Sequence, residues 1–376
     1  MHINVVLLSN YIIFVKNWTN MKKFTMFTVA FVALALISVS CIKKEYNMDD
    51  AKATATVPVN KTSELAPQTF LGFDDNQAVK PDEKGDLHFE SISETISKPA
   101  PADPSEPVIF EKPLEVDMMK APEIIKKSSG GELTDPAVKV TVSNPSSAPV
   151  SFGGKLSVDG STPVILPSVE IPAGQTVDLL FTPDVKSPAE PADIYAPLPA
   201  ELKNQLSKGM DQGMVLSDVV LTPKDAPKAS GAIKANDAGL FSVNCKFVAP
   251  LSFVAGSVIK ISQSFSDLGF DIDKYVTGSL EFDVNFSGTN FLPFEVDFNA
   301  VSEGSGLTGK LSKKIAAATS SQGTPFDAVF VVKTLASKAV INDVKLNIEL
   351  KAAKTPAVLN VKEPFIITAD TVKIIK

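Results

Sequence analysis

From about Glu115 onward, apolar and polar residues alternate along the chain. Strict alternation places every second side chain on one face, so it predicts β-strands with one buried and one solvated face. The clearest examples are 138–142, 155–159 and 176–181. Turn-forming residues separate these strands: Asn144-Pro145, Gly153-Gly154, Asp159-Gly160 and Pro172-Ala173-Gly174. Strands at this spacing predict an all-β fold of tandem antiparallel β-sandwiches of the Ig-like kind.

The same order of strands and loops occurs twice. Segments 138–158 (VKVTVSNPSSAPVSFGGKLSV) and 280–301 (LEFDVNFSGTNFLPFEVDFNAV) each hold an alternating strand, a polar loop, a proline and a second alternating strand. Further along, 215–221 (VLSDVVL) matches 340–346 (VINDVKL). Two matched pairs in the same order indicate a duplicated domain. We therefore expect one β-sandwich domain at 116–225 and a second at 226–376.

Residues 41–115 are polar, acidic and rich in proline. Proline has no backbone N–H to donate to a sheet, so we expect a partly ordered tether with a few short strands, such as one at 87–89. Signals for helices are few. Residues 199–206 carry leucines four apart and predict a short helix that ends near Gly209, and 311–318 is a second helix candidate.

The first 40 residues have the pattern of an export signal. Lys22 and Lys23 precede an uncharged apolar run at 24–39, and small residues close it. A basic, an apolar and a small-residue segment in this order make a secretory signal peptide. The run is shorter than the roughly 20 residues that a spanning helix needs. Met21 opens a signal of ordinary length, so we expect it to be the true start; an extended signal from Met1 is the alternative.

The charge of the exported part excludes one class of partner. Three of the 36 basic residues and none of the 43 acidic residues precede Cys41, so the mature chain carries −10, against −7 for the whole chain. Nucleic-acid binding needs clustered positive charge, and we expect none. All basic residues are lysine. The lack of arginine, the usual bidentate clamp, also disfavours a site for anions, although a lysine-biased genome is the alternative, and favoured, explanation for it.

Few residues of the exported part are suited to catalysis. His88 is the only histidine after Cys41, and it falls in the expected tether. A Ser-His-Asp or Cys-His arrangement needs a histidine to move the proton, so we expect no catalytic residue and no enzyme. Cys245 shares the apolar face of 241–247 and is interpreted as a small buried hydrophobe, with no partner for an internal disulfide.

Metal ligands are equally sparse. Zinc sites use clusters of Cys and His, and calcium sites use carboxylates and carbonyls from one loop. Neither Asp271 with Asp273 nor Asp74 with Asp75 has EF-hand spacing, and we interpret all four as solvated residues. We therefore expect no metal and no cofactor. A pair of carboxylates for glycoside hydrolysis is an alternative that the sequence leaves open.

Ser38-Val39-Ser40-Cys41 resembles the lipobox of bacterial lipoproteins, in which a cysteine after small residues is lipidated and becomes the first mature residue. Ser38 departs from the usual leucine. With the Lys-Glu-rich start at 42–46, the acidic tether and the alternating strands, the chain is similar in layout to Bacteroidetes envelope lipoproteins. The resemblance implies lipidation at Cys41 and an outer-membrane location, on the surface or the periplasmic face, but no particular activity.

Asp370-Thr371-Val372 resembles the Asp-Ser/Thr-aliphatic motif that Bacteroidetes proteins use for O-glycosylation. The resemblance implies a modification at Thr371. An ordinary threonine near a strand edge is the alternative interpretation.

Three functions fit these features. We favour a non-catalytic lipoprotein, held on the membrane by its N-terminal lipid, that displays β-sandwiches for adhesion or for assembly of an envelope complex. The second is a glycan-binding lipoprotein of a polysaccharide-uptake system. The lack of tryptophan after Trp18 counts against it, whereas Tyr195 and Tyr275 on one exposed face would favour it. The third is a fimbrial-type subunit assembled by strand donation. Many such subunits mature by cleavage after arginine, and this chain, which has no arginine, cannot mature in that way. No residue pattern in the sequence identifies the protein or glycan that would be the ligand.

Overall fold

The computed structural model describes residues 54–73, 76–101, 103, 105–118, 121–184, 193–224, 239–265, 270–271, 281–305, 307–334 and 340–375. Two compact units share the chain. One comprises Asp75–Lys260 and Lys351–Asn360, and we call it the inserted unit. The other is divided by it into Met1–Asp74, Ile261–Leu350 and Val361–Lys376, and we call it the split unit. Each is described by itself.

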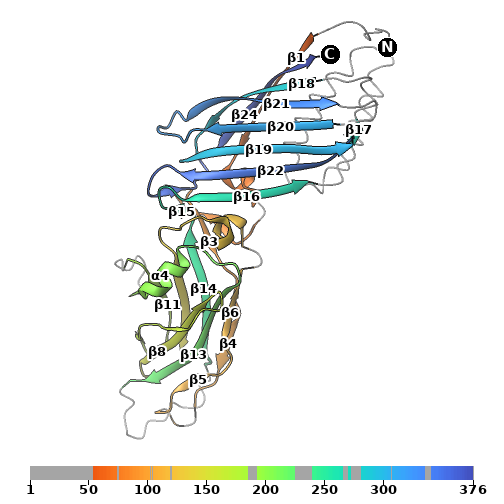
Figure 1. The fold of residues 1–376 in the computed structure, drawn as a ribbon. Coiled ribbons are helices and arrows are strands. Elements are labelled where there is room, and N and C mark those ends of the chain that lie inside the picture. The colour runs from red at the N-terminus through yellow and green to blue at the C-terminus, as the bar shows by residue number, and fades with distance from the viewer. Residues whose placement is uncertain are drawn as a thin grey trace, which may run out of the picture. The chain divides into compact units, whose positions relative to one another are not determined.

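The inserted unit consists of two main sheets (Figure 1). The first has the order β12-β11-β7-β14-β3-β2, with β4 also on β14. Its strands are β2 (Val79–Pro81), β3 (Leu87–Glu90), β4 (Thr95–Lys98), β7 (Ala137–Asn144), β11 (Gln175–Thr182), β12 (Asp193–Pro197) and β14 (Phe241–Pro250). β12 runs parallel to β11, and the other pairs are antiparallel.

The second sheet of this unit has the order β10-β8-β13-β5, with β6 on β13 and β9 on β8. Its strands are β5 (Val108–Phe110), β6 (Leu114–Asp117), β8 (Val150–Val158), β9 (Val164–Ile165), β10 (Val169–Ile171) and β13 (Gly213–Pro223). The alternation in β7 and β8 buries every second residue. Phe152 of β8 and Phe181 of β11 meet across the core with ring centroids 6.2 Å apart, so the two sheets form a sandwich.

Short elements complete the inserted unit. The helix α4 (Ala200–Leu206) buries Leu202 and Leu206, as the leucine spacing predicts. The 3-10 turns η2 (Glu123–Ile125) and η3 (Lys127–Ser129) precede β7. A two-stranded sheet pairs β15 (Ser252–Phe253) with β23 (Ala357–Val358).

The split unit forms one continuous sheet with the order β1-β24-β18-β21-β20-β19-β22-β16, and β17 pairs with β22 (Figure 1). The strands are β1 (Thr54–Leu65), β16 (Val258–Phe265), β17 (Phe270–Asp271), β18 (Glu281–Asn290), β19 (Phe294–Ser305), β20 (Leu307–Ile315), β21 (Thr324–Thr334), β22 (Val340–Ala352) and β24 (Phe365–Ile375). The short helix α3 (Pro67–Phe70) follows β1. Phe365 stacks between Phe70 and Phe326, with centroid distances of 4.7 and 5.1 Å, and fills one end of the core.

Both units have one topology. Numbered along the chain, the eight main strand positions are β3/β4, β5/β6, β7, β8, β10, β11, β13 and β14 in the inserted unit, and β1, β16, β18, β19, β20, β21, β22 and β24 in the split unit. In each, strands pair in the orders 1-8-3-6 and 2-7-4-5. This is the eight-strand jelly roll, so the prediction of all-β antiparallel sandwiches is confirmed, and their strand order is that of a jelly roll rather than of an Ig domain.

The matched sequence segments fall on equivalent strands, which supports the duplication. Residues 138–158 cover β7 and β8, and 280–301 cover β18 and most of β19. Residues 215–221 lie in β13, and 340–346 lie in β22. The inserted unit therefore interrupts a second copy of its own fold, between the first and second strands of that copy.

The structure divides the chain differently from the expected domains 116–225 and 226–376. In a jelly roll the first and last strands pair, so a unit needs both ends of its segment. The expected tether at 41–115 accordingly supplies β1 to the split unit and β2 to β5 to the inserted unit, including the short strand expected at 87–89. Residues 311–318, a helix candidate, belong mostly to β20.

A buried asparagine ends the third strand of each copy. Asn144 Nδ2 donates to the carbonyls of Ala148, Ile171 and Pro172 (2.9, 3.3 and 3.0 Å), and its Oδ1 accepts from the Ser146 amide (3.1 Å). Asn290 Nδ2 donates to the carbonyls of Phe294 and Ala316 (3.0 and 2.8 Å), and its Oδ1 accepts from the Leu292 amide (3.0 Å). Each side chain thus fixes the turn into the fourth strand against a later segment of its unit.

Candidate binding face of the inserted unit

Several residues singled out from the sequence lie outside the described residues. They include Cys41 with the whole signal region, Asp74, Asp75, Asp273 and Tyr275. Lipidation of Cys41 therefore stays a prediction. Among the residues that the structure describes, no helix is long and apolar enough to cross a membrane.

Cys245 and Thr371 both lie on central strands. Cys245 is fully buried in β14, and burial raises the pKa of its thiol to about 12, which suits the predicted role as a small hydrophobe. Thr371 lies in β24 at a register shift, is partly exposed, and accepts a hydrogen bond from Asn285 Nδ2 at 3.0 Å. Its O-glycosylation stays a prediction.

His88 is partly exposed on β3, opposite Lys80 of β2 and Pro250 of β14. Asp271 lies in β17. Among the described residues, no group of three or more His, Cys, Asp or Glu side chains is placed to hold a metal ion.

Six charged residues, one from each strand of the sheet except β4, cross the outer face of the first sheet of the inserted unit. We call them the charge band: Lys80 of β2, Glu90 of β3, Lys246 of β14, Lys139 of β7, Asp178 of β11 and Asp193 of β12. The chain neighbours of Glu90, Lys246, Lys139 and Asp178 are buried, so period-two geometry turns these four side chains to the opposite, solvent side. The register places the two end members on the same face, because Asp193 pairs with Asp178 and Lys80 pairs with His88, two residues before Glu90. The register sets Lys246 directly opposite Lys139.

Two ion pairs hold the middle of the band. Lys139 Nζ lies 2.6 Å from Asp178 Oδ2, and Lys246 Nζ lies 2.7 Å from Glu90 Oε1. Thr141 donates to the other oxygen of Asp178 at 2.6 Å. The four paired side chains are between 27 and 39 % exposed, so they are sheltered by their neighbours but open to a ligand. Two like charges facing each other on adjacent strands are unfavourable, and the flanking carboxylates offset this.

The charges of the band act on one another. Partial burial works to raise the pKa of Asp178, but the hydrogen bonds from Lys139 and Thr141 outweigh it and leave this pKa below its usual range. For Glu90, burial is likewise outweighed by Lys246 and by the charges of Lys139 and Lys80, and the pKa is again lowered.

Lys139 shows the converse balance. Burial works to lower its pKa, whereas the hydrogen bond to Asp178 and the charges of Glu90 and Asp193 raise it overall. The shifts of Glu90, Asp178 and Lys139 thus all favour the charged form. A general acid for glycoside hydrolysis needs a raised carboxyl pKa, so Glu90 and Asp178 suit ligand binding rather than that reaction.

Tyr195 adds an aromatic ring to this face. It pairs in register with Leu180, which in turn pairs with Lys139, and all three side chains are partly exposed. Tyr195, Leu180, Lys139 and Lys246 thus form one row across four strands. Sequence reasoning marked Tyr195 but missed the band, because its members come from strands whose pairing no local pattern reveals.

The equivalent row of the split unit is uncharged. Asn285 lies five residues before Asn290, as Lys139 lies before Asn144, and it pairs with Val329 and Thr371. Thr371 and Asn285 therefore stand where the inserted unit has Lys246 and Lys139. An amide-to-hydroxyl hydrogen bond replaces the two ammonium groups. The jelly roll does not itself require the band.

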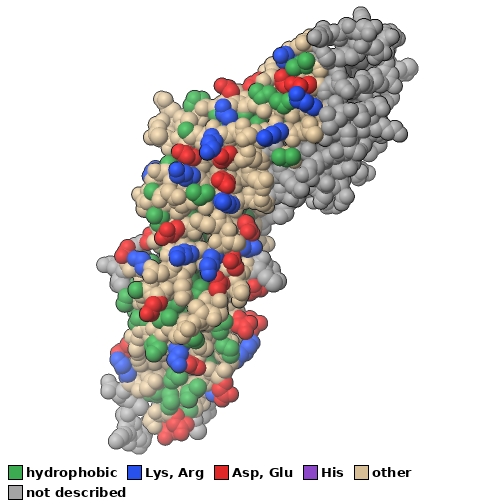
Figure 2. All heavy atoms as spheres, viewed as in Figure 1, with side chains coloured by type: hydrophobic (Ala, Val, Ile, Leu, Met, Phe, Trp, Pro, Cys, Tyr) green, Lys and Arg blue, Asp and Glu red, His purple; other side chains and the backbone are tan. Residues whose placement is uncertain are grey.

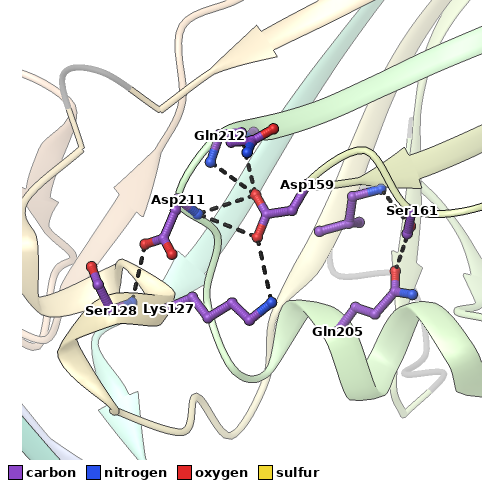
Figure 3. A network of polar contacts seen from close by, with 9 residues as sticks. Lys127, Ser128, Asp159, Ser161, Gln205, Asp211 and Gln212 are labelled. Carbon is purple, nitrogen blue, oxygen red and sulfur yellow. Dashed lines mark hydrogen bonds and ion pairs between the residues drawn. The ribbon is translucent and has the colours of Figure 1, made fainter.

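A second polar network, shown in Figure 3, ties three loops of the inserted unit together. The Asp159 carboxylate accepts backbone N–H groups of Asp211, Gln212 and Gly213 (3.1, 2.8 and 3.2 Å), and Lys127 Nζ lies 4.0 Å away. The Asp211 carboxylate accepts the Ser128 amide at 3.0 Å. The oxygens of Asp159 are thus occupied by donors of the protein itself, and we interpret this network as structural.

On the face of the molecule that Figure 2 shows, acidic and lysine side chains are interspersed over the described residues, and hydrophobic side chains lie in small groups between them. No large area there carries one sign of charge. The individual exposed apolar residues of the inserted unit include Ile92, Ile109 and Ile165.

No family model and no curated protein matches the chain. Among solved structures, a Parabacteroides distasonis protein provisionally described as secreted matches with a TM-score of 0.48 and 10% identity, over 86% of this chain and 99% of that one. The PBSX exported protein XepA has a TM-score of 0.20 at 10% identity, over 79% and 94% of the two chains. The tandem CBM22 domain of Paenibacillus barcinonensis Xyn10C has a TM-score of 0.18 at 8% identity, over 86% and 98%. Likenesses this low assign no function.

Proposed function

We propose that this protein is a non-catalytic lipoprotein of the bacterial outer membrane that displays its jelly-roll units for adhesion or for assembly of an envelope complex. The charge band is the observation that carries the binding role. It gathers six acidic and basic residues on the open face of one sheet, and the equivalent row of the duplicated unit lacks the paired lysines. The split unit has the same topology with Asn285 and Thr371 at these positions, so the fold does not require the paired lysines.

The anchoring part of the proposal rests on the apolar run that ends at Cys41. Each buried methylene of an acyl chain contributes about 0.8 kcal/mol, so two or more chains hold a soluble domain on a membrane. We expect the wild-type protein to enter the detergent phase in Triton X-114 partitioning and the Cys41→Ala variant to stay in the aqueous phase. Far-UV circular dichroism should show the same β-sheet spectrum for both. Equal partitioning of the two proteins would refute the lipid anchor.

A further inference from the structure

We propose that the charge band, together with Tyr195 and Leu180, binds an uncharged polysaccharide chain. This deepens the proposed function, because it names the ligand class of the displayed unit and relies on that unit having a binding rather than a catalytic role.

The charge balance of the face favours a neutral ligand. The band holds three lysines and three carboxylates, so it presents no net charge to a polyanion or a polycation. The mature chain carries −10 overall, and this field repels anionic polymers. An uncharged polymer needs no net charge on the band and is not repelled by the negative charge of the chain.

The groups of the band match hydroxyls. An ammonium has three donors and a carboxylate has about four acceptor positions, and each ion pair uses only part of these. A sugar hydroxyl donates and accepts at once, so it can bridge the Lys139–Asp178 pair or the Lys246–Glu90 pair, which are already fixed at 2.6 and 2.7 Å. Side chains held in place before binding lose less entropy when the ligand arrives.

The apolar requirement is met in the same row. Sugar rings have apolar C–H faces, and Tyr195 and Leu180 present partly exposed apolar surface beside Lys139. An aromatic ring with a polar tip suits a ligand that is apolar on one side and hydrated on the other. Six strands spaced about 4.8 Å apart give a face about 24 Å wide, which suits an extended chain.

The split unit supplies an internal control. In its equivalent sheet, Asn285 Nδ2 donates a hydrogen bond to Thr371 Oγ1 at 3.0 Å, and Val329 stands where the inserted unit has Leu180. The inference therefore assigns the polysaccharide to the inserted unit alone.

The test is affinity electrophoresis of the full mature chain in native gels that contain galactomannan, mixed-linkage β-glucan or glycogen, with polygalacturonate and heparin as anionic counterparts. We expect at least one neutral polysaccharide to retard the protein and neither polyanion to do so. Two variants then locate the site: Lys139→Asn with Lys246→Thr, which copies the residues of the split unit, and Tyr195→Ala. Each should weaken the binding by about tenfold or more.

The matched control is Lys155→Ala. Lys155 forms an ion pair with Asp218 at 2.8 Å on the other sheet of the same unit, so this variant should bind like the wild type. Retardation by none of the neutral polymers, retardation only by the polyanions, or unchanged binding in both band variants would overturn the inference. Detergent partitioning reads the anchor separately, so a failed binding test leaves that part of the proposed function intact.

Discussion

Replacing the buried asparagine at the end of the third strand tests the fold most sharply. Asn144 is 1 % exposed and makes its contacts to the turn and to the segment before β11 with one amide group. Asn144→Ala leaves the Ser146 amide without its acceptor and the carbonyls of Ile171 and Pro172 without their donor. An unsatisfied buried polar group costs about 1–3 kcal/mol.

Two of these three groups, the Ser146 amide and the Ile171 carbonyl, are buried, and two such groups cost about 2–6 kcal/mol. Water can reach the part-buried Pro172 carbonyl, so we expect a loss of about 2–4 kcal/mol in the free energy of unfolding of the inserted unit. Asn144→Asp should be at least as damaging. It keeps the acceptor for Ser146 but loses both amide hydrogens and points a carboxylate at three carbonyl oxygens.

The assay is urea unfolding of the full chain with pulsed hydrogen exchange and mass spectrometry, which assigns each peptide to a unit. Asn144→Ala should move the midpoint of peptides from the inserted unit, and the matched Asn290→Ala should move that of peptides from the split unit. A loss below about 0.5 kcal/mol for Asn144→Ala, the size of an ordinary surface substitution, would refute the reasoning.

Three further results are expected. Asp159→Asn should lower the free energy of unfolding by about 1–2 kcal/mol, because charge-assisted hydrogen bonds weaken to neutral ones. It should also speed amide hydrogen exchange at 211–213, and unchanged exchange there would contradict the structural role of Asp159. Cys245 should resist iodoacetamide at pH 8 until the protein unfolds, since the raised pKa keeps its thiol protonated and burial blocks access; rapid alkylation of the native chain would disprove this. The pKa values of Glu90 and Asp178 are lower in the folded than in the unfolded state, so these carboxylates stabilise the fold above their unfolded-state pKa of about 4. This contribution is lost as the pH falls through the lower folded-state values. Acid titration of stability should therefore be steeper for the wild type than for the double lysine variant, and identical profiles would rule out the coupling.

The alternation of apolar residues gives the strands and their buried faces directly from the sequence. It places Val138, Val140 and Val142 in the core, and the structure leaves each of them with no exposed surface. The repeat of strand, polar loop and strand likewise indicates the duplication, because both copies bury one face of their equivalent strands with the same alternating pattern.

The domain boundaries were not predictable in this way. A jelly roll pairs its first strand with its last, and β1 pairs with β24 across almost the whole length of the chain. Short strands such as β3 and proline-rich loops give no local pattern from which the first strand of a unit can be identified. The same limit applies to the binding face: Lys139 and Lys246 look like ordinary solvated residues until the register of β7 and β14 brings them together.

The intact mass of the protein purified from its own membranes tests the account most directly. We predict the mass of a chain that begins at Cys41 and carries added acyl chains. That result would establish export, the cleavage site and the lipid anchor in one measurement. A chain that begins at Met1 or Met21, or an unmodified Cys41, would contradict the proposal that this protein displays its jelly rolls from the membrane.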